Sequence, residues 1–197
     1  MYDYVASRVE ELLNHRRSCG HTAKGDELAI MVAGCRAGDA GCFSALVDIY
    51  GSRCYGYFYR LTGNSELSEE LLSELFVRLV ERIGSYRGGF FESWLFRIAS
   101  NIFRDKLRAR QRRQKMLDVR RRQLESRVTE PKASEDDRID RLQIQLDKLN
   151  AETRELIMLR FYSDLTIREI SELRSESIGT TASRLHRGLK KLRGMMK

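Results

Sequence analysis

The chain has 197 residues, a formal net charge of +8 and a pI near 9.5. This length holds one ordinary domain or two small ones, and the charge favours an anionic partner, either nucleic acid or an acidic membrane surface. No run approaches the roughly 20 apolar residues that cross a bilayer and no signal peptide is recognisable, so the sequence predicts a cytoplasmic protein without a membrane partner.

The N-terminal segment, residues 1–25, lies before the main helical pattern and carries a short amphipathic stretch up to about residue 18. We treat it as an N-terminal extension. Cys19, Cys35, Cys42 and Cys54 show no C-x-x-C spacing, which predicts free, buried thiols in a reducing compartment. A metal site that includes Cys19 and His21 is the alternative, but we predict no metal and no cofactor.

The rest of the chain is predicted to be all-α, because strand-like alternation is absent and Pro131 is the only proline. Asn64 and Asn150 are predicted helix N-caps, and Gly63 and Gly84 follow predicted helix ends. Helices are predicted from Asp26 or Glu27 through Gly34, in a longer segment that includes Phe43 and ends near Gly63, over 65–84, from 93 to around 122, over 139–149 and 151–161, from 166 to near 173, and from 178 onward.

A change in composition divides these helices into two domains. Between Glu125 and Asp140 acidic residues become frequent and apolar residues thin out, which indicates a linker. We therefore predict a first helical domain (26–122), a flexible linker (123–138) and a second helical domain (139–197). The relative orientation of the two domains is expected to vary.

The predicted helix that starts at Ser93 has two unlike faces when it is read at 3.6 residues per turn. One face is apolar, with Leu95, Ile98, Ala99 and Ile102. The other carries three guanidinium groups and one amide, from Arg97, Asn101, Arg104 and Arg108. Guanidinium groups match phosphates and an asparagine amide can pair with a base edge, so this face is typical of a nucleic-acid contact. A solvated charged face is the alternative for such a helix taken alone.

The C-terminal residues follow a helix-turn-helix pattern. Thr166 and Glu169 form a capping box that opens a short helix, residues 174–177 interrupt it, and a second helix begins at Ile178. Its inward positions are predicted to be Ile178, Ala182, Leu185, Leu189 and Leu192. Its outward positions are Thr180, Ser183, Arg184, Arg187 and Lys191, which suits insertion into the major groove. A helical hairpin with a basic, solvated tail is the alternative.

Both basic segments resemble the two regions kept by bacterial extracytoplasmic-function (ECF) sigma factors, the smallest members of the primary sigma family. Tyr86-Arg-Gly, Ser93-Trp-Leu-Phe-Arg-Ile-Ala-Ser-Asn101 and Asp105-Lys-Leu-Arg108 are similar to the family pattern F-R-G, S-W-L-x-R-I-A-x-N and D-x-x-R of region two. Glu70-Leu-Leu-Ser-Glu-Leu-Phe76 is similar to its D-L-x-Q-E-x-F. Leu159-Arg-Phe, Glu169-Ile and the segment from Gly179 to Arg193 are similar to region four.

The resemblance implies two partners, core RNA polymerase and promoter DNA, and it leaves the existence of a third, an anti-sigma factor, open. Core polymerase would contact Glu70, Glu74 and Arg78. The −10 element would contact Tyr86, Arg97, Asn101, Arg104 and Arg108, with one base of the non-template strand extruded beside Asn101. The −35 element would contact Thr180, Ser183, Arg184, Arg187 and Lys191. Promoter melting would then use neither ATP nor a catalytic residue of this chain.

Several residues depart from the family pattern. Ser73 stands where glutamine is usual in the polymerase-binding helix, and Ser175 replaces the usual turn glycine. Arg174 and Glu176 replace apolar residues, and Ala182 replaces a frequent lysine that would meet a phosphate. The predicted −35 contacts are therefore less closely matched than those of region two.

The main rival is a helix-turn-helix transcription regulator that binds an operator without polymerase. The segment from Tyr86 to Arg108 argues against it, because such a regulator has no use for that segment. An enzyme is not indicated, since His15, His21 and His186 are scattered and no catalytic or phosphate-cradling motif is present. A basic peripheral membrane protein would have to rely on the short N-terminal helix.

Overall fold

The structure is a computed structural model and describes residues 25–121, 137–163 and 165–195, over which every regular element is helical. The elements are α2 (Gly25–Arg36), α3 (Ala40–Thr62), α4 (Ser65–Arg82), the 3-10 helix η1 (Ile83–Ser85), α5 (Phe91–Arg121), α6 (Asp137–Asp147), α7 (Ala151–Phe161), α8 (Ile167–Arg174) and α9 (Ile178–Met195). The predicted all-α class is confirmed. The predicted helix before residue 18, the Cys19 and His21 pair and nearly all of the predicted linker lie outside the described residues.

The predicted helix caps are formed except at Gly84, which lies within η1, because α4 already ends at Arg82 with Ile83 as its C-cap. The Asn64 side chain accepts a hydrogen bond from the backbone N–H of Leu67 at 2.8 Å, and Asn150 accepts one from Thr153 at 2.9 Å. Gly63 ends α3 in the left-handed conformation. Thr166 and Glu169 make both bonds of the capping box that opens α8. Each cap satisfies an orphan backbone group at a helix end, so these residues fix where the chain turns.

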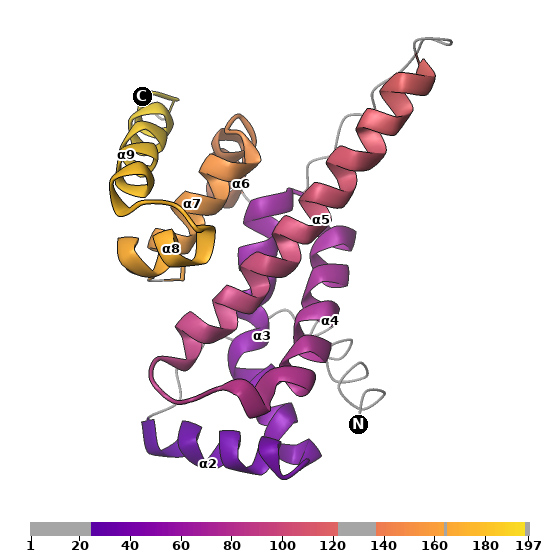
Figure 1. Ribbon diagram of the computed structural model, residues 1–197, viewed down its shortest axis with the longest axis vertical. Helices are drawn as coiled ribbons and strands as arrows, with labels where there is room; N and C mark the ends of the chain where they lie inside the picture. The colour runs from indigo at the N-terminus through magenta and orange to yellow at the C-terminus, as the bar shows by residue number, and fades with distance from the viewer. Residues whose placement is uncertain (1–24, 122–136, 164, 196–197) are drawn as a thin grey trace.

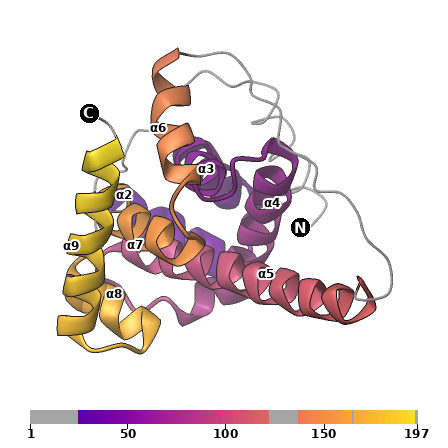
Figure 2. The same cartoon turned by 90° about the horizontal axis from the view of Figure 1, so that it is seen from above.

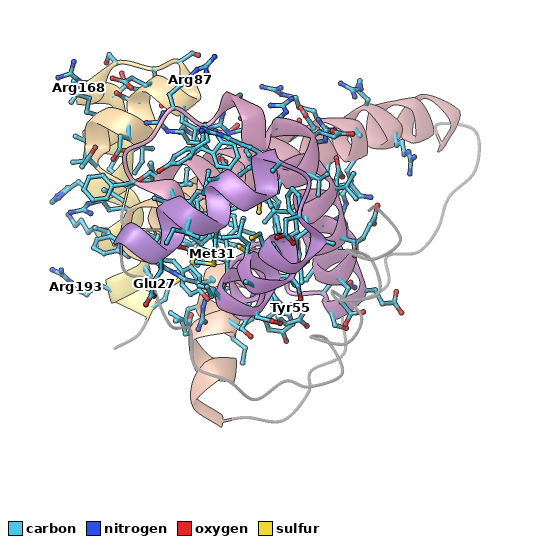
Figure 3. All side chains as sticks on the ribbon, turned by 90° about the horizontal axis from the view of Figure 1, so that it is seen from below. Glu27, Met31, Tyr55, Arg87, Arg168 and Arg193 are labelled. Carbon is cyan, nitrogen blue, oxygen red and sulfur yellow. The ribbon has the colours of Figure 1, made fainter. Side chains whose placement is uncertain are left out.

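The N-terminal half (residues 25–121) is a bundle of α3, α4 and α5, with α2 across one end (Figure 1). Apolar side chains at helical spacing fill its core, and the fully buried ones include Phe43, Tyr57, Phe58, Leu72, Leu75, Phe76 and Leu95. Figure 3 labels Met31 on α2, a residue that packs against this core. Burial of each large side chain stabilises the bundle by about 1.5–3 kcal/mol. The packing fixes which face of α5 remains outside.

The C-terminal half (residues 137–195) contains α6 to α9, and its core residues include Leu146, Leu156, Leu159 and Leu165. On α9 the inward face is only partly as predicted. Leu185 is buried and Leu189 and Leu192 pack on the core, but Ile178 is 54% exposed. Thr181 is fully buried instead. Ile178 is the first residue of α9 and lies beyond the surface that the neighbouring helices cover, so its assignment as an inward residue was wrong.

The two halves pack against each other in this structure, an arrangement that the sequence did not predict. Figure 2 shows α7 lying beside α5, and α7 also contacts α3. Arg154 of α7 is buried and donates to the carbonyl oxygen of Leu61 at 2.8 Å, while Arg53 of α3 donates to that of Tyr162 at 3.0 Å. The sequence signalled a linker, but it held no sign that the flanking helices carry complementary donors and acceptors.

A glycine at position 175 is expected to stabilise the protein. Ser175 ends α8 with φ of 53°, in the left-handed region that costs a non-glycine residue about 1–2 kcal/mol. The added backbone entropy of glycine offsets part of this gain. Ser175→Gly should therefore raise the free energy of unfolding by about 0.5–1 kcal/mol, measured as a higher urea midpoint with an unchanged slope. A midpoint at or below the wild-type value would contradict this account.

Candidate nucleic-acid interface

A cleft between α4 and α5 gathers most of the predicted −10 residues. It has a volume of about 200 Å³ and is lined by Arg78, Arg82, Ile98, Asn101, Ile102, Arg104, Asp105 and Arg108. Asn101 and Arg108 are exposed, and Asp105 is the only acid among the described residues that line the cleft. Arg108 and Asp105 form the i, i+3 ion pair at 3.4 Å that is common on helices. Arginines on both walls make the cleft suited to a phosphate group.

The sequence did not indicate that Arg82 would belong to this cleft. Arg82 lies in the last turn of α4, and only the antiparallel packing of α4 on α5 brings it beside Asn101. Arg78 lines the same cleft, although the resemblance assigned it to polymerase. Its guanidinium also donates to Glu74 at 2.9 Å. The sequence does show that Arg78 and Arg82 are spaced i, i+4 and therefore lie on one face of α4, which could have grouped Arg82 with Arg78.

Two of the predicted −10 residues contact the C-terminal half. Arg104 Nε donates to Glu155 at 2.9 Å, and its Nη1 donates to the carbonyl oxygen of Leu173 at 2.9 Å. Arg97 Nη2 lies 3.5 Å from Glu169 Oε1. In this arrangement Asn101 and Arg108 are open to a ligand, Arg104 is occupied by the chain itself, and Arg97 is 40% exposed but paired with Glu169.

The loop between η1 and α5 presents an aromatic side chain, but it is not the one predicted. Gly88 and Gly89 have φ of 94° and 88°, a backbone conformation that suits glycine. Tyr86 is buried among Phe91 and Trp94, and its hydroxyl donates to the carbonyl oxygen of Gly89 at 2.6 Å. Burial raises the pKa of the Tyr86 phenol. Tyr86 therefore shapes the loop, and Phe90, 84% exposed, is the ring at its surface.

The face of α4 predicted to bind polymerase is accessible. The side chains of Glu70 and Glu74 are 57% and 39% exposed. Glu70 pairs with Lys106 of α5, and Glu74 pairs with Arg78 on its own helix. Such exposed pairs contribute at most about 1 kcal/mol each, so a protein partner can exchange them for its own contacts at little cost.

All of the outward positions predicted on α9 are at the surface. Thr180, Ser183, Arg184, Arg187 and Lys191 are exposed. Arg184 Nη1 donates to Glu176 Oε1 at 2.7 Å, and Glu176 also accepts from Arg174 Nε at 3.3 Å. Figure 3 shows that the labelled Arg168 of α8 and Arg193 of α9 extend outward from the ribbon. This half therefore carries a second cationic surface.

A cleft of about 340 Å³ between α7 and α9 continues that surface inward. Four cations line it, from Arg174, Arg184, Arg187 and Lys191, together with Glu152 and the capping residue Asn150. The Arg174 side chain is only 7% exposed, because the carboxylates of Glu155 and Glu176 hold it. The departure of residue 174 from the apolar family pattern thus has a structural reason.

The described cysteines are free, as predicted, and two of them are buried. Burial raises the pKa of the Cys35 and Cys54 thiols from 9.0 to about 12. At pH 8 only about one thiol in 10,000 is then a thiolate, the form that reacts. Iodoacetamide at pH 8 should modify the partly exposed Cys42 well before Cys35 and Cys54, as measured by peptide mass spectrometry. Urea should remove the difference, and equal labelling of all three in the native protein would contradict it.

The same two thiols make stability depend on pH in one direction. An unfolded cysteine loses its proton near pH 9, whereas the folded thiols keep theirs to about pH 12. The raised pKa values therefore contribute stability below pH 9 that is lost as the pH rises from 9 to 12.

The described residues contain no group of three or more His, Cys, Asp or Glu side chains placed to hold a metal ion. None of the described helices has the length and apolar content that a membrane span requires.

Comparison with known proteins identifies both halves. Residues 46–113 match the family described as Sigma-70 region 2, and residues 139–192 match Sigma-70, region 4. The RNA polymerase sigma factor CarQ of Myxococcus xanthus is 31% identical, over 82% of this chain and 92% of its own length. The ECF sigma factor SigE of Mycolicibacterium smegmatis is 35% identical over 75% of this chain, which spans 59% of SigE. SigW of Bacillus subtilis is 29% identical, over 82% of this chain and 92% of its own length.

Solved structures agree on the fold. The sigma factor RpoE from Bartonella quintana, in complex with the anti-sigma factor NepR, aligns with a TM-score of 0.57 at 22% identity over 87% of this chain and 94% of its own. CnrH, in complex with the cytosolic domain of CnrY, aligns with a TM-score of 0.59 at 19% identity, over 85% of this chain and 95% of its own. With region two and region four in order and a curated sigma factor covered over most of its length, the chain belongs to the ECF RNA polymerase sigma factors, which direct promoter-specific transcription initiation.

Proposed function

We propose that the two cationic surfaces divide promoter recognition between them. The α4–α5 cleft and the loop at Phe90 hold the melted −10 element, and the outward face of α9 reads the −35 element. The observation that supports this division is the exposed amide of Asn101 among arginines in the cleft, on a separate half from the exposed Arg184 and Arg187. Phosphate contacts position the DNA, while Asn101 and Arg184 supply the groups that distinguish bases.

Melting needs no covalent step from this chain. A base that leaves the stack costs a few kcal/mol, and stacking on an aromatic ring returns about 1–3 kcal/mol per base. The exposed ring of Phe90 and the amide of Asn101 supply such contacts. Core polymerase docks on the outer face of α4 through Glu70 and Glu74, and we assign Arg78 a place in both contacts because it lines the cleft as well.

An anti-sigma factor is a further partner that we propose for this chain, since the sigma factor RpoE, which has the same fold, was solved in complex with the anti-sigma factor NepR.

The experiment that tests the proposed function is capture of purified bacterial core RNA polymerase, followed by transcription from a promoter library. We expect stable capture and new start sites that share −10 and −35 sequences. Failure to capture polymerase, together with tight binding of a specific duplex by the protein alone, would instead indicate an operator-binding regulator.

Alanine at Asn101 should slow promoter opening more than it weakens the initial closed complex. The amide meets its base only after that base has left the stack, so its contribution arises during melting. On a promoter from the library, we expect the opening rate, followed by permanganate reactivity of unpaired thymines, to fall about tenfold. If Asn101→Ala weakened the closed complex as much as it slowed promoter opening, Asn101 would have a simple docking role.

A further inference from the structure

The contact between the two halves is organised around one buried carboxylate. The Glu155 side chain of α7 is 3% exposed and accepts hydrogen bonds from three groups. Two donors belong to α5, the Ser100 hydroxyl and Arg104 Nε, the latter at 2.9 Å. The third is Arg174 Nη1 at the end of α8, at 2.6 Å. A buried carboxylate needs such partners, because an uncompensated charge in a protein interior is strongly unfavourable.

Further contacts surround Glu155 and use the same basic face of α5. Arg104 also donates to the carbonyl oxygen of Leu173, and Arg97 pairs with Glu169 of α8 at 3.5 Å. The acceptors facing α5 are therefore two carboxylates and a carbonyl oxygen. A guanidinium group binds a carboxylate and a phosphate with the same fork of N–H donors. The C-terminal half thus offers α5 the chemistry that a DNA backbone would offer.

The packing at this interface is also tight. At Gly56 of α3, an added Cβ would lie 2.4 Å from the hydroxyl oxygen of Tyr162, which follows α7. The absence of a side chain at position 56 lets the end of α7 approach α3 closely. Arg53, one turn away, reaches the Tyr162 carbonyl oxygen. Shape and charge therefore both favour the arrangement in which the two halves pack against each other, which we call the closed form.

We propose that the C-terminal half is an internal partner of the basic face of α5, with Glu155 and Glu169 standing where DNA phosphates would bind. While the halves are closed, Arg104 is unavailable to the −10 element and Arg97 is paired with Glu169, so the chain must open before region two can hold melted DNA through both arginines. Core polymerase or DNA that binds only the open form shifts the chain toward it. This inference rests on the proposed function only for the identity of the competing ligand.

Three variants weaken the closed form by different means. Glu155→Gln keeps the shape of the central side chain and removes its charge. Glu169→Gln removes the charge that faces Arg97, and glutamine still serves in a capping box. Gly56→Ala places a methyl group against the Tyr162 hydroxyl, and because alanine favours a helix more than glycine does, loss of folding is not expected from it. The matched control is Glu172→Gln, the same change at an exposed residue of α8 that pairs with Arg168.

Two readouts separate opening from DNA binding. Small-angle X-ray scattering of the full-length protein reports its radius of gyration without any ligand. Fluorescence anisotropy with a labelled pool of random single-stranded 12-mers reports affinity for unpaired DNA. If about a tenth of the chains are open in the wild type, full opening lowers the apparent Kd about tenfold. Circular dichroism at 222 nm and thermal unfolding confirm that each variant is folded.

We expect a larger radius of gyration and about tenfold tighter binding for Glu155→Gln and Gly56→Ala, a smaller change for Glu169→Gln, and wild-type values for Glu172→Gln. An unchanged radius of gyration in folded Glu155→Gln and Gly56→Ala overturns the proposal. If these variants have a larger radius of gyration but bind the 12-mers no more tightly than the wild type, the claim that the C-terminal half blocks the basic face of α5 is wrong. If neither the opened variants nor the wild type bind the 12-mers, both the proposed −10 role of region two and the proposed blocking of α5 are contradicted.

Discussion

Alanine at Arg184 should weaken recognition of the −35 element by about 1–3 kcal/mol, which is about 5- to 150-fold in affinity. Arg184 is exposed in the first half of α9, where a recognition helix meets base edges. A guanidinium group that pairs with a guanine makes two hydrogen bonds that no other base reproduces. Because the loss comes from a base contact, it should shrink when the preferred −35 bases are themselves changed.

The measurement is a binding series on duplexes that carry the −35 sequence found in the promoter library, each altered at one base pair. Arg187→Ala provides the comparison, since an arginine further along α9 is expected to meet phosphate and to lower affinity evenly across the series. A uniform loss for Arg184→Ala would make it a phosphate contact too.

Glu176 gives this prediction an internal check. Its carboxylate holds Arg184 at 2.7 Å in the free protein and would repel a nearby phosphate. Glu176→Gln should therefore improve −35 binding where Arg184→Ala weakens it, and the double variant should lose that improvement if Glu176 acts through Arg184. Additive effects would show that the two residues act separately.

Removing two arginines from the α4–α5 cleft should reduce the salt dependence of binding to single-stranded −10 DNA. Each phosphate contact on a single strand contributes about 0.7 to the slope of log K against log salt. Arg82→Ala combined with Arg108→Ala should therefore lower the slope by about 1.4, and affinity at low salt should fall with it. The two residues come from facing helices and line one cleft, so both can reach the same stretch of backbone.

The measurement is a titration of fluorescently labelled single-stranded −10 DNA with protein at several salt concentrations, from which the slope of log K against log salt is obtained. Arg168→Ala is the matched control, since its side chain is 81% exposed on α8 and lies outside the cleft. A double variant whose slope equals that of the wild type would exclude Arg82 and Arg108 as phosphate contacts, whatever its affinity.

The sequence predicted the helices well because their ends carry local signals. Asn64, Asn150 and the Thr166–Glu169 pair act on backbone groups within a few residues, so they are readable from neighbours alone. The faces of α5 and α9 followed from periodicity, with Ile178 as the exception at a helix end. Local signals of this kind account for most of the fold.

The parts that sequence reasoning missed depend on which helices meet. Arg82 joins the cleft only because α4 packs on α5, and Tyr86 is buried only because Phe91 and Trp94 close around it. The closed arrangement of the halves rests on Glu155, which lies in a segment that reads simply as a helix. Partners so far apart in the chain leave no periodic trace in a single sequence.

The shared carboxylate of Glu155 has a consequence for genetics. Arg104 finds its acceptors 51 and 69 residues further along the chain, at Glu155 and Leu173. A substitution in α7 or α8 will then change promoter strength and resemble a −10 mutation, although neither helix carries an assigned −10 contact. Second-site suppressors of an altered Arg104 should accordingly map to α7 and α8, and promoter phenotypes of this chain should be assigned to a DNA element only after both halves have been sequenced.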